Sequence, residues 1–158
     1  MNARRRIFLQ GSGALSAALV AGWVQPVRGL AAEWNKAGFE SRGAPETLRA
    51  IGAGSMLESS AISIKAPELA ESGMSVPIEV SSQIPGTHSI AVMVERNAQP
   101  LAAQFNFESG SAAYVSTRLK IGETSNVRAV VKAGDKTYTA VRQVKVTIGG
   151  CGGTTVQN

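Results

Sequence analysis

Apolar side chains recur at every second position from Ala61 onward, and this alternation constrains the fold more than any other feature of the 158-residue chain. Alternation with a period of two places the apolar side chains on one face of a strand, so each run predicts a strand with one buried face. The alternating apolar positions are Ile62 and Ile64; Val76, Ile78 and Val80; Ile90, Val92 and Val94; Leu101, Ala103, Phe105 and Phe107; Val115, Leu119 and Ile121; Val127, Ala129 and Val131; and Tyr138, Ala140, Val144, Val146 and Ile148. About seven short strands at regular spacing predict an antiparallel, immunoglobulin-like β-sandwich.

Turn-forming residues separate the runs and agree with this fold. Residues 84–86, Ile-Pro-Gly, place proline and glycine where a type II turn requires them. Residues 133–136, Ala-Gly-Asp-Lys, predict a tight hairpin between the last two strands. Because the chain has a single cysteine, it lacks the disulfide between sheets that antibody domains carry.

A different pattern precedes the strands. Residues 32–58 are predicted to be helical, because Pro45 suits a first helical turn and Gly52 suits the stop. The expected fold class is therefore mainly β. A short N-terminal helical segment over residues 32–58 is followed by the antiparallel sandwich over residues 59–148 and by a flexible, glycine-rich C-terminal arm over residues 149–158.

Residues 1–31 are expected to form a removable export leader. Arg5 and Arg6, followed by Phe8 and Leu9, resemble the twin-arginine export signature, and small residues at the end of the segment suit a cleavage site. A transmembrane anchor is the alternative, but an anchor requires roughly 20 strongly apolar residues, and glycine and serine interrupt this stretch. The leader therefore predicts export of a folded protein to the periplasm, with no stable membrane association.

The charge of the chain does not indicate a nucleic-acid partner. The whole chain has 16 basic and 11 acidic residues, which gives a net charge of +5. The leader contains four of the basic residues and none of the acidic ones, so the net charge from residue 32 onward is +1. No basic cluster remains there to contact phosphates, and nucleic-acid binding is not expected.

Few residues after the leader can carry chemistry. They include one histidine, His88, one aspartate, Asp135, and one cysteine, Cys151. These side chains offer neither converging metal ligands nor a Cys-x-x-Cys or haem-attachment motif, so no metal and no cofactor are expected. A Cys–His pair would require His88 to approach the tail, and an exposed histidine at the start of a strand is the simpler interpretation. Self-contained catalysis is not expected; a thiol-dependent enzyme, the alternative, would turn over without partners.

Cys151 lies seven residues from the C-terminus, between Gly149 and Gly150 on one side and Gly152 and Gly153 on the other. An unpaired cysteine in an oxidising compartment indicates intermolecular pairing or a reactive thiol. Glycine neighbours add backbone freedom and no bulk, so they suit a thiol that enters narrow channels on other proteins. Extended residues span roughly 3.3–3.6 Å each, which carries the sulfur more than about 10 Å from the domain. An ordinary thiol has a pKa near ~8.5, so partners are expected to activate it.

Residues 146–153, Val-Thr-Ile-Gly-Gly-Cys-Gly-Gly, the strand-rich domain and the twin-arginine leader together resemble the SoxY family. SoxY proteins are the sulfur-carrier subunits of the bacterial thiosulfate-oxidising (Sox) system. The resemblance covers essentially the whole chain after the leader, and a Gly-Gly-Cys-Gly-Gly motif near a C-terminus is highly specific. The chain departs from the family pattern in one respect: residues 154–158 follow the second glycine pair, where chains of the family commonly stop.

The resemblance implies that Cys151 holds sulfur intermediates covalently, as an S-thiosulfonate and a persulfide, and that the chain is a non-catalytic carrier without a cofactor. It implies a SoxZ-like partner subunit in a heterodimer, and transient contacts with a c-type cytochrome, a manganese hydrolase and a sulfane dehydrogenase of the Sox system. The alternative is an exported β-sandwich binding or assembly module whose cysteine only forms intermolecular disulfides. Met93, Tyr114 and Tyr138 are expected to be exposed and are candidates for the subunit interface.

Overall fold

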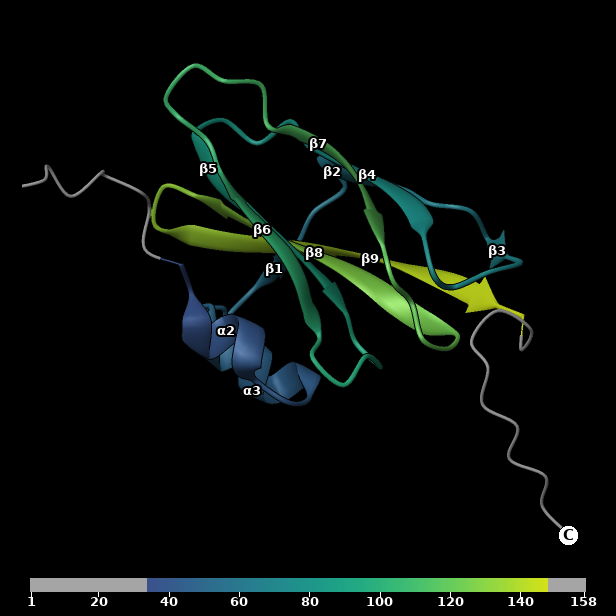
Figure 1. The fold of residues 1–158 in the computed structure, drawn as a ribbon. Helices are drawn as coiled ribbons and strands as arrows, with labels where there is room; N and C mark the ends of the chain where they lie inside the picture. The colour runs from purple at the N-terminus through teal and green to yellow at the C-terminus, as the bar shows by residue number, and fades with distance from the viewer. Residues whose placement is uncertain (1–33, 148–158) are drawn as a thin grey trace, which may run out of the picture. The chain divides into compact units, whose positions relative to one another are not determined.

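A computed structural model describes residues 34–147, which form nine strands and two short helices (Figure 1). The helices are α2 (Lys36–Glu40) and α3 (Ala44–Ala50). The strands are β1 (Leu57–Glu58), β2 (Ile62–Lys65), β3 (Leu69–Ala70), β4 (Val76–Ser82), β5 (Thr87–Val94), β6 (Leu101–Asn106), β7 (Tyr114–Leu119), β8 (Ser125–Ala133) and β9 (Lys136–Val146). No helix within these residues is long and apolar enough to cross a membrane.

The strands form two sheets that pack on each other as a sandwich (Figure 1). The smaller sheet has the order β2–β4–β7. The larger sheet has the order β1–β9–β8–β5–β6, and β3 also pairs with β9. Neighbouring strands are antiparallel, except that β1 and β3 each run parallel to β9. This architecture confirms the predicted immunoglobulin-like sandwich.

The apolar face of each main strand is buried between the sheets. Ile78 and Val80 of the smaller sheet and Ile90, Val92 and Val131 of the larger sheet have no exposed surface and belong to one continuous core. Fully burying a side chain of this size stabilises a fold by roughly 1.5–3 kcal/mol, so the core fixes both the pairing of the sheets and the register of the strands. The alternation of period two was therefore a correct guide to the core.

The second half of β5 is buried on both faces, which the sequence did not indicate. Met93, expected to be exposed, is completely buried, so that prediction was wrong. The cause is the helical segment: Leu48 and Ile51 cover the outer face of the larger sheet and pack in one cluster with Met93. Tyr114 is exposed, as expected, whereas Tyr138 is partly buried against the main core.

The sequence signals at both ends of α3 agree with the structure. Pro45 lies in the first turn, and Gly52 follows the C-cap residue with a φ of +69°, in the left-handed region that glycine adopts without steric cost. The amide of Gly52 donates to the carbonyl of Arg49 at 3.0 Å. Ala53, 1% exposed, then anchors the segment against the sheet. The end of the segment expected to be helical, Leu57–Glu58, instead forms β1.

Both turns expected from proline and glycine are present. The amide of Thr87 donates to the carbonyl of Ile84 at 3.3 Å, and Gly86 between them has a φ of +74°, as a type II turn requires. The hairpin between β8 and β9 has Gly134 at its first central position with a φ of +55°. A side chain at either glycine would be strained in this conformation.

Candidate functional site at the end of the last strand

The site residues predicted from the sequence lie outside the described part of the chain. They are Cys151, its neighbours Gly149, Gly150, Gly152 and Gly153, and the export-signal residues Arg5, Arg6, Phe8 and Leu9. The structure instead describes the segment from which the chain continues to the cysteine. We define this arm root as residues 144–147; Cys151 follows its last residue, Thr147, by four positions.

The arm root is held on one edge by the chain around β3. Leu69 pairs with Lys145 and Ala70 with Val146, so β3 runs parallel to the end of β9 (Figure 1). The amide of Thr147 donates to the carbonyl of Ala70 at 3.1 Å. The hydroxyl of Thr147 donates to the carbonyl of the next residue along, at 3.0 Å. The fold therefore fixes the main chain up to the last described residue before the arm.

A second set of contacts holds the arm root from the side of β8. The amide of Val146 donates to the hydroxyl of Thr124 at 3.0 Å, where a regular ladder would use a carbonyl. Gly73 lies beside the Val146 side chain, and its carbonyl accepts a hydrogen bond from the amide of Ile121 at 2.7 Å. A Cβ at Gly73 would collide with the carbonyl oxygen of Ile121 and come within 3.0 Å of the Val146 side chain. Only glycine allows this close approach.

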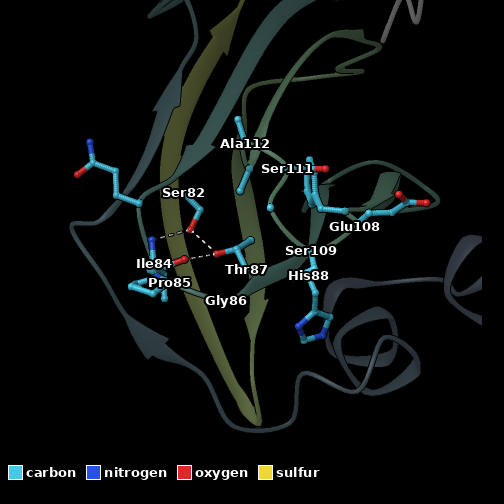
Figure 2. Close-up of a pocket in the computed structure, with 14 residues that line it drawn as sticks. Ser82, Ile84, Pro85, Gly86, Thr87, His88, Glu108, Ser109, Ser111 and Ala112 are labelled. Atoms are coloured by element: carbon cyan, nitrogen blue, oxygen red, sulfur yellow. Dashed lines mark hydrogen bonds between the residues drawn. The ribbon is translucent and has the colours of Figure 1, made fainter.

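A cavity lies at the other end of the sandwich. It has a volume of about 520 Å³ and is lined by the turn between β4 and β5 and by the loop between β6 and β7 (Figure 2). Two of its hydroxyl groups are hydrogen-bonded: Ser82 contacts Thr87 at 2.9 Å, and the hydroxyl of Thr87 donates to the carbonyl of Ile84 at 2.7 Å. His88 lines this cavity and is exposed. Two of the polar side chains in its wall, Ser82 and Thr87, are therefore already hydrogen-bonded.

His88 lies too far from the arm root to assist a thiol on the arm. It occupies a bulge in β5 beside Thr87, which pairs with Ala133 at the hairpin where β9 starts. The 11 residues of β9 rise about 3.3 Å each, so the arm root lies about 30 Å from this hairpin. Four extended residues beyond Thr147 add at most about 14 Å. The simpler interpretation of an exposed histidine is therefore correct, and His88 does not reach Cys151 of its own chain.

Within residues 34–147 no group of three or more His, Cys, Asp or Glu side chains is placed to hold a metal ion.

The sequence carries no signal for several features of the arm root. The two-residue strand β3 and the residues Gly73 and Thr124 carry no pattern that identifies them, because their partners are distant in the sequence. Only the combination of a strand end and a nearby cysteine indicated where to look.

These features define an immunoglobulin-like sandwich whose last strand, fixed on both edges, leads within a few residues to a thiol between glycines. The model of the family of the sulfur oxidation protein SoxY matches residues 48–151, so the match ends on Cys151. The chain belongs to the SoxY family, as its C-terminal motif predicted. It is therefore a sulfur carrier protein of sulfur oxidation.

Solved structures support the same assignment. The sulfur carrier protein SoxY from Chlorobium limicola f thiosulfatophilum is 41% identical to this chain, with a TM-score of 0.59; the match covers 63% of this chain and 86% of that one. The superoxide reductase (neelaredoxin) from Ignicoccus hospitalis is 18% identical with a TM-score of 0.50, covering 55% of this chain and 80% of that one. This second likeness concerns the sandwich fold alone. A search of the curated proteins finds no match to the chain.

Proposed function

We propose that the chain is a periplasmic, covalent sulfur carrier in thiosulfate oxidation, with Cys151 as the attachment site. One observation carries the proposal. The end of β9 is hydrogen-bonded on both edges, Cys151, the single cysteine of the sequence, follows Thr147 by four positions, and the family match ends on that cysteine. The twin-arginine signature of Arg5 and Arg6 supports export in the folded state.

The arrangement suits a group that is presented to other proteins. From Thr147 the sulfur reaches up to about 14 Å beyond the fixed root. Gly149, Gly150, Gly152 and Gly153 surround the thiol with backbone only, which allows entry into a channel too narrow for larger side chains. His88 lies at the far end of the sandwich, so the base that activates the thiol belongs to the partner. The chain therefore acts as a substrate of its partners and not as an enzyme.

The chemistry follows from the carried groups. A c-type cytochrome partner takes two electrons and couples the Cys151 thiol to thiosulfate, which forms a cysteine S-thiosulfonate and releases one proton. A manganese hydrolase then adds water to the terminal sulfonate sulfur, so that sulfate leaves and a persulfide remains. A sulfane dehydrogenase removes six electrons from the outer sulfur with three waters, which gives an S-sulfonate. A last hydrolysis releases a second sulfate and restores the thiol.

We propose a SoxZ-like subunit as the stable partner, in a heterodimer that forms before export. Family membership implies partners within the Sox system in general. A leader that directs folded protein to the membrane is compatible with a partner that travels already bound. The exposed Tyr114, at the start of β7, remains a candidate for this interface.

An intact-mass spectrum of the protein isolated from thiosulfate-grown cells tests the proposal. A carrier shows adducts of one thiosulfate group or one added sulfur that a reducing agent removes, and Cys151→Ser shows none. The same substitution abolishes thiosulfate-dependent oxidation by the reconstituted system. If the cysteine only forms disulfides between copies or with an assembly partner, the wild-type spectrum shows no such adducts and Cys151→Ser retains oxidation. Either result would overturn the carrier.

A further inference from the structure

The edge of β9 that faces away from β8 is unpaired over its middle. β1 pairs with the start of this edge and β3 with its end, and no described strand pairs with it in between (Figure 1). The amide of Lys145 points to this edge, because it donates to the carbonyl of Glu68 at 2.9 Å. Backbone groups point to the two edges of a strand at alternate residues, so those of Val141 and Gln143 point the same way. We define residues 141–143 as the open edge.

The surface beside the open edge is hollowed. One hollow of about 320 Å³ has Val141 in its wall, and another of about 310 Å³ has Gln143 in its wall. Val141 is 43% exposed, although it is an apolar residue in the middle of a long strand. The side chain of Arg142 lies on the opposite face, and its buried Nε atom has no hydrogen-bond partner within residues 34–147. The open edge therefore lacks a backbone partner, an apolar cover for Val141 and an acceptor for Arg142.

Residues 154–156, Thr-Thr-Val, match these three needs. They follow the cysteine and its glycines, and they lie beyond the residues that the family model matches. Three β-branched residues in a row favour an extended strand. We propose that this tail segment pairs antiparallel with the open edge, with Thr154 opposite Gln143 and Val156 opposite Val141.

This register provides a partner for each of the unpaired groups. Val141 and Gln143 each exchange two hydrogen bonds with the residue opposite, because their backbone groups point to the open edge. Val156 packs beside Val141 as a cross-strand apolar pair. Thr155 lies opposite Arg142 on the same face, so its hydroxyl accepts the hydrogen bond that the buried Nε lacks. A shift of one residue that brings Val156 opposite Arg142 would leave the Nε without an acceptor.

The chain between β9 and the tail segment is long enough for this pairing. Seven residue steps join Thr147 to Thr154 and span up to about 24 Å, whereas Thr147 lies about 13 Å along β9 from Gln143. The surplus lets the chain pass around β3, and four of the six linking residues are glycine. With both ends of this loop fixed, Cys151 projects at most about 9 Å from β9 instead of about 14 Å. Docking of the tail segment therefore draws the thiol back, a regulation of Cys151 that rests on the carrier function proposed above.

Nuclear magnetic resonance of the full chain under reducing conditions tests the pairing. An antiparallel pair without hydrogen bonds brings its Cα atoms to about 4.5 Å, so the α-hydrogens of Thr155 and Arg142 give a strong nuclear Overhauser effect. The tethered tail segment has an effective concentration on the order of millimolar, which keeps even a weak pairing formed about half of the time or more. The amides of Val141 and Gln143 then exchange about two- to fivefold more slowly than in a chain shortened after Gly153.

Two proline variants are a matched pair. Val156→Pro removes an amide that faces the open edge, so exchange becomes as fast as in the shortened chain. Gln157→Pro introduces the same residue one position later, where the amide faces away from β9, and exchange stays slow. Thr155→Val keeps the shape of the side chain without the hydroxyl and gives an intermediate rate. Equal thermal unfolding of all these chains checks that the sandwich is intact.

The reach of the thiol is measured separately by alkylation. A maleimide attached to a large polymer reacts with Cys151 about two- to fivefold more slowly in the full chain than in the chain shortened after Gly153. Iodoacetamide, which is small, shows a lesser difference between the two chains. Equal rates with the polymer reagent would show that the tail segment does not restrain the thiol, and the proposed regulation would be wrong.

Four further results would overturn the pairing. Exchange at Val141 and Gln143 that is the same in the full and shortened chains excludes the tail segment as the occupant. Protection that rises with protein concentration assigns the open edge to a second copy of the chain, and protection that appears only with the partner subunit assigns it to that subunit. Protection without the contact between Thr155 and Arg142 refutes the register. None of these measurements uses thiosulfate, so the carrier function is decided separately by the mass spectrum of protein from cells.

Discussion

The two ends of β9 are built differently, although the same strand runs through both. At its start, the chain turns through a hairpin near a cavity of about 520 Å³, in whose wall the hydroxyls of Ser82 and Thr87 are hydrogen-bonded. At its end, hydrogen bonds from two separate segments, residues 68–71 and Thr124, converge on residues 145–147. Two basic side chains near that end have no ion-pair partner among the described residues. The proposed function uses the end at residues 145–147, from which the chain continues to Cys151.

The largest expected effect tests this contrast directly. Cys151→Ser removes the attachment point beyond the clasped end, so thiosulfate-dependent oxidation by the reconstituted system falls to background. His88→Gln, at the opposite end, leaves the rate unchanged because His88 does not reach Cys151. Initial rates of electron transfer to the cytochrome measure both. A substantial loss of rate in His88→Gln would show that the far cavity takes part in the reaction, and the contrast would fail.

Glycine substitutions compare the stability of the two ends. Gly73→Ala at the clasped end is expected to lower the free energy of unfolding by about 2–4 kcal/mol, because the new Cβ meets the backbone of Ile121 and the side chain of Val146. Gly86→Ala at the other end is expected to cost about 1 kcal/mol, because only its φ of +74° is unfavourable. Gly54→Ala, with open space around it, is the control and stays within about 0.5 kcal/mol.

Urea denaturation followed by tryptophan fluorescence or circular dichroism measures all three glycine variants. The order of the costs is the informative result. A Gly73→Ala variant as stable as Gly54→Ala would mean that the loop at Gly73 moves away freely and does not clasp the arm root. The arm root would then owe its position to β3 and β8 alone.

The sequence was informative wherever one residue type determines the outcome locally. The alternation of Ile62 with Ile64, or of Ile90 with Val92, predicted buried strand faces because one side of each strand meets the core. The same alternation misjudged Met93, because α3 covers the second face of β5 and that contact joins residues more than 40 positions apart. Burial on both faces is a tertiary property that a short window cannot reveal.

The residues of the candidate site likewise divide into those that the sequence identifies and those that it does not. Cys151 and its glycines stand out in the sequence, since no other cysteine competes with them. The contacts that hold the arm root do not stand out, because Thr124 and β3 acquire their role only when they meet the end of β9 in the fold. Register, which spans the whole sheet, decides which of these segments meet.

The smallest expected effect concerns how firmly the arm root is held. Thr124→Val keeps the shape of the side chain but removes the hydroxyl that accepts the amide of Val146 at 3.0 Å. Loss of one partly buried hydrogen bond of this kind costs about 1 kcal/mol, and more if the amide is left unsatisfied. We expect hydrogen exchange at the Val146 amide to become roughly five- to tenfold faster, in line with that energy, while amides in the centre of β5 change much less.

Thr117→Val in β7 is the matched control, because the Thr117 side chain makes no hydrogen bond among the described residues and the exchange of Val146 should not change. If Thr124→Val and Thr117→Val behave alike, the hydroxyl contributes nothing to the root. If exchange at Val146 rises while the thiosulfate-dependent rate of the reconstituted system is unchanged, the clasp determines only where the arm begins. A proportional fall in that rate would instead show that partners require a fixed starting point, so that the rigidity of this end belongs to the function.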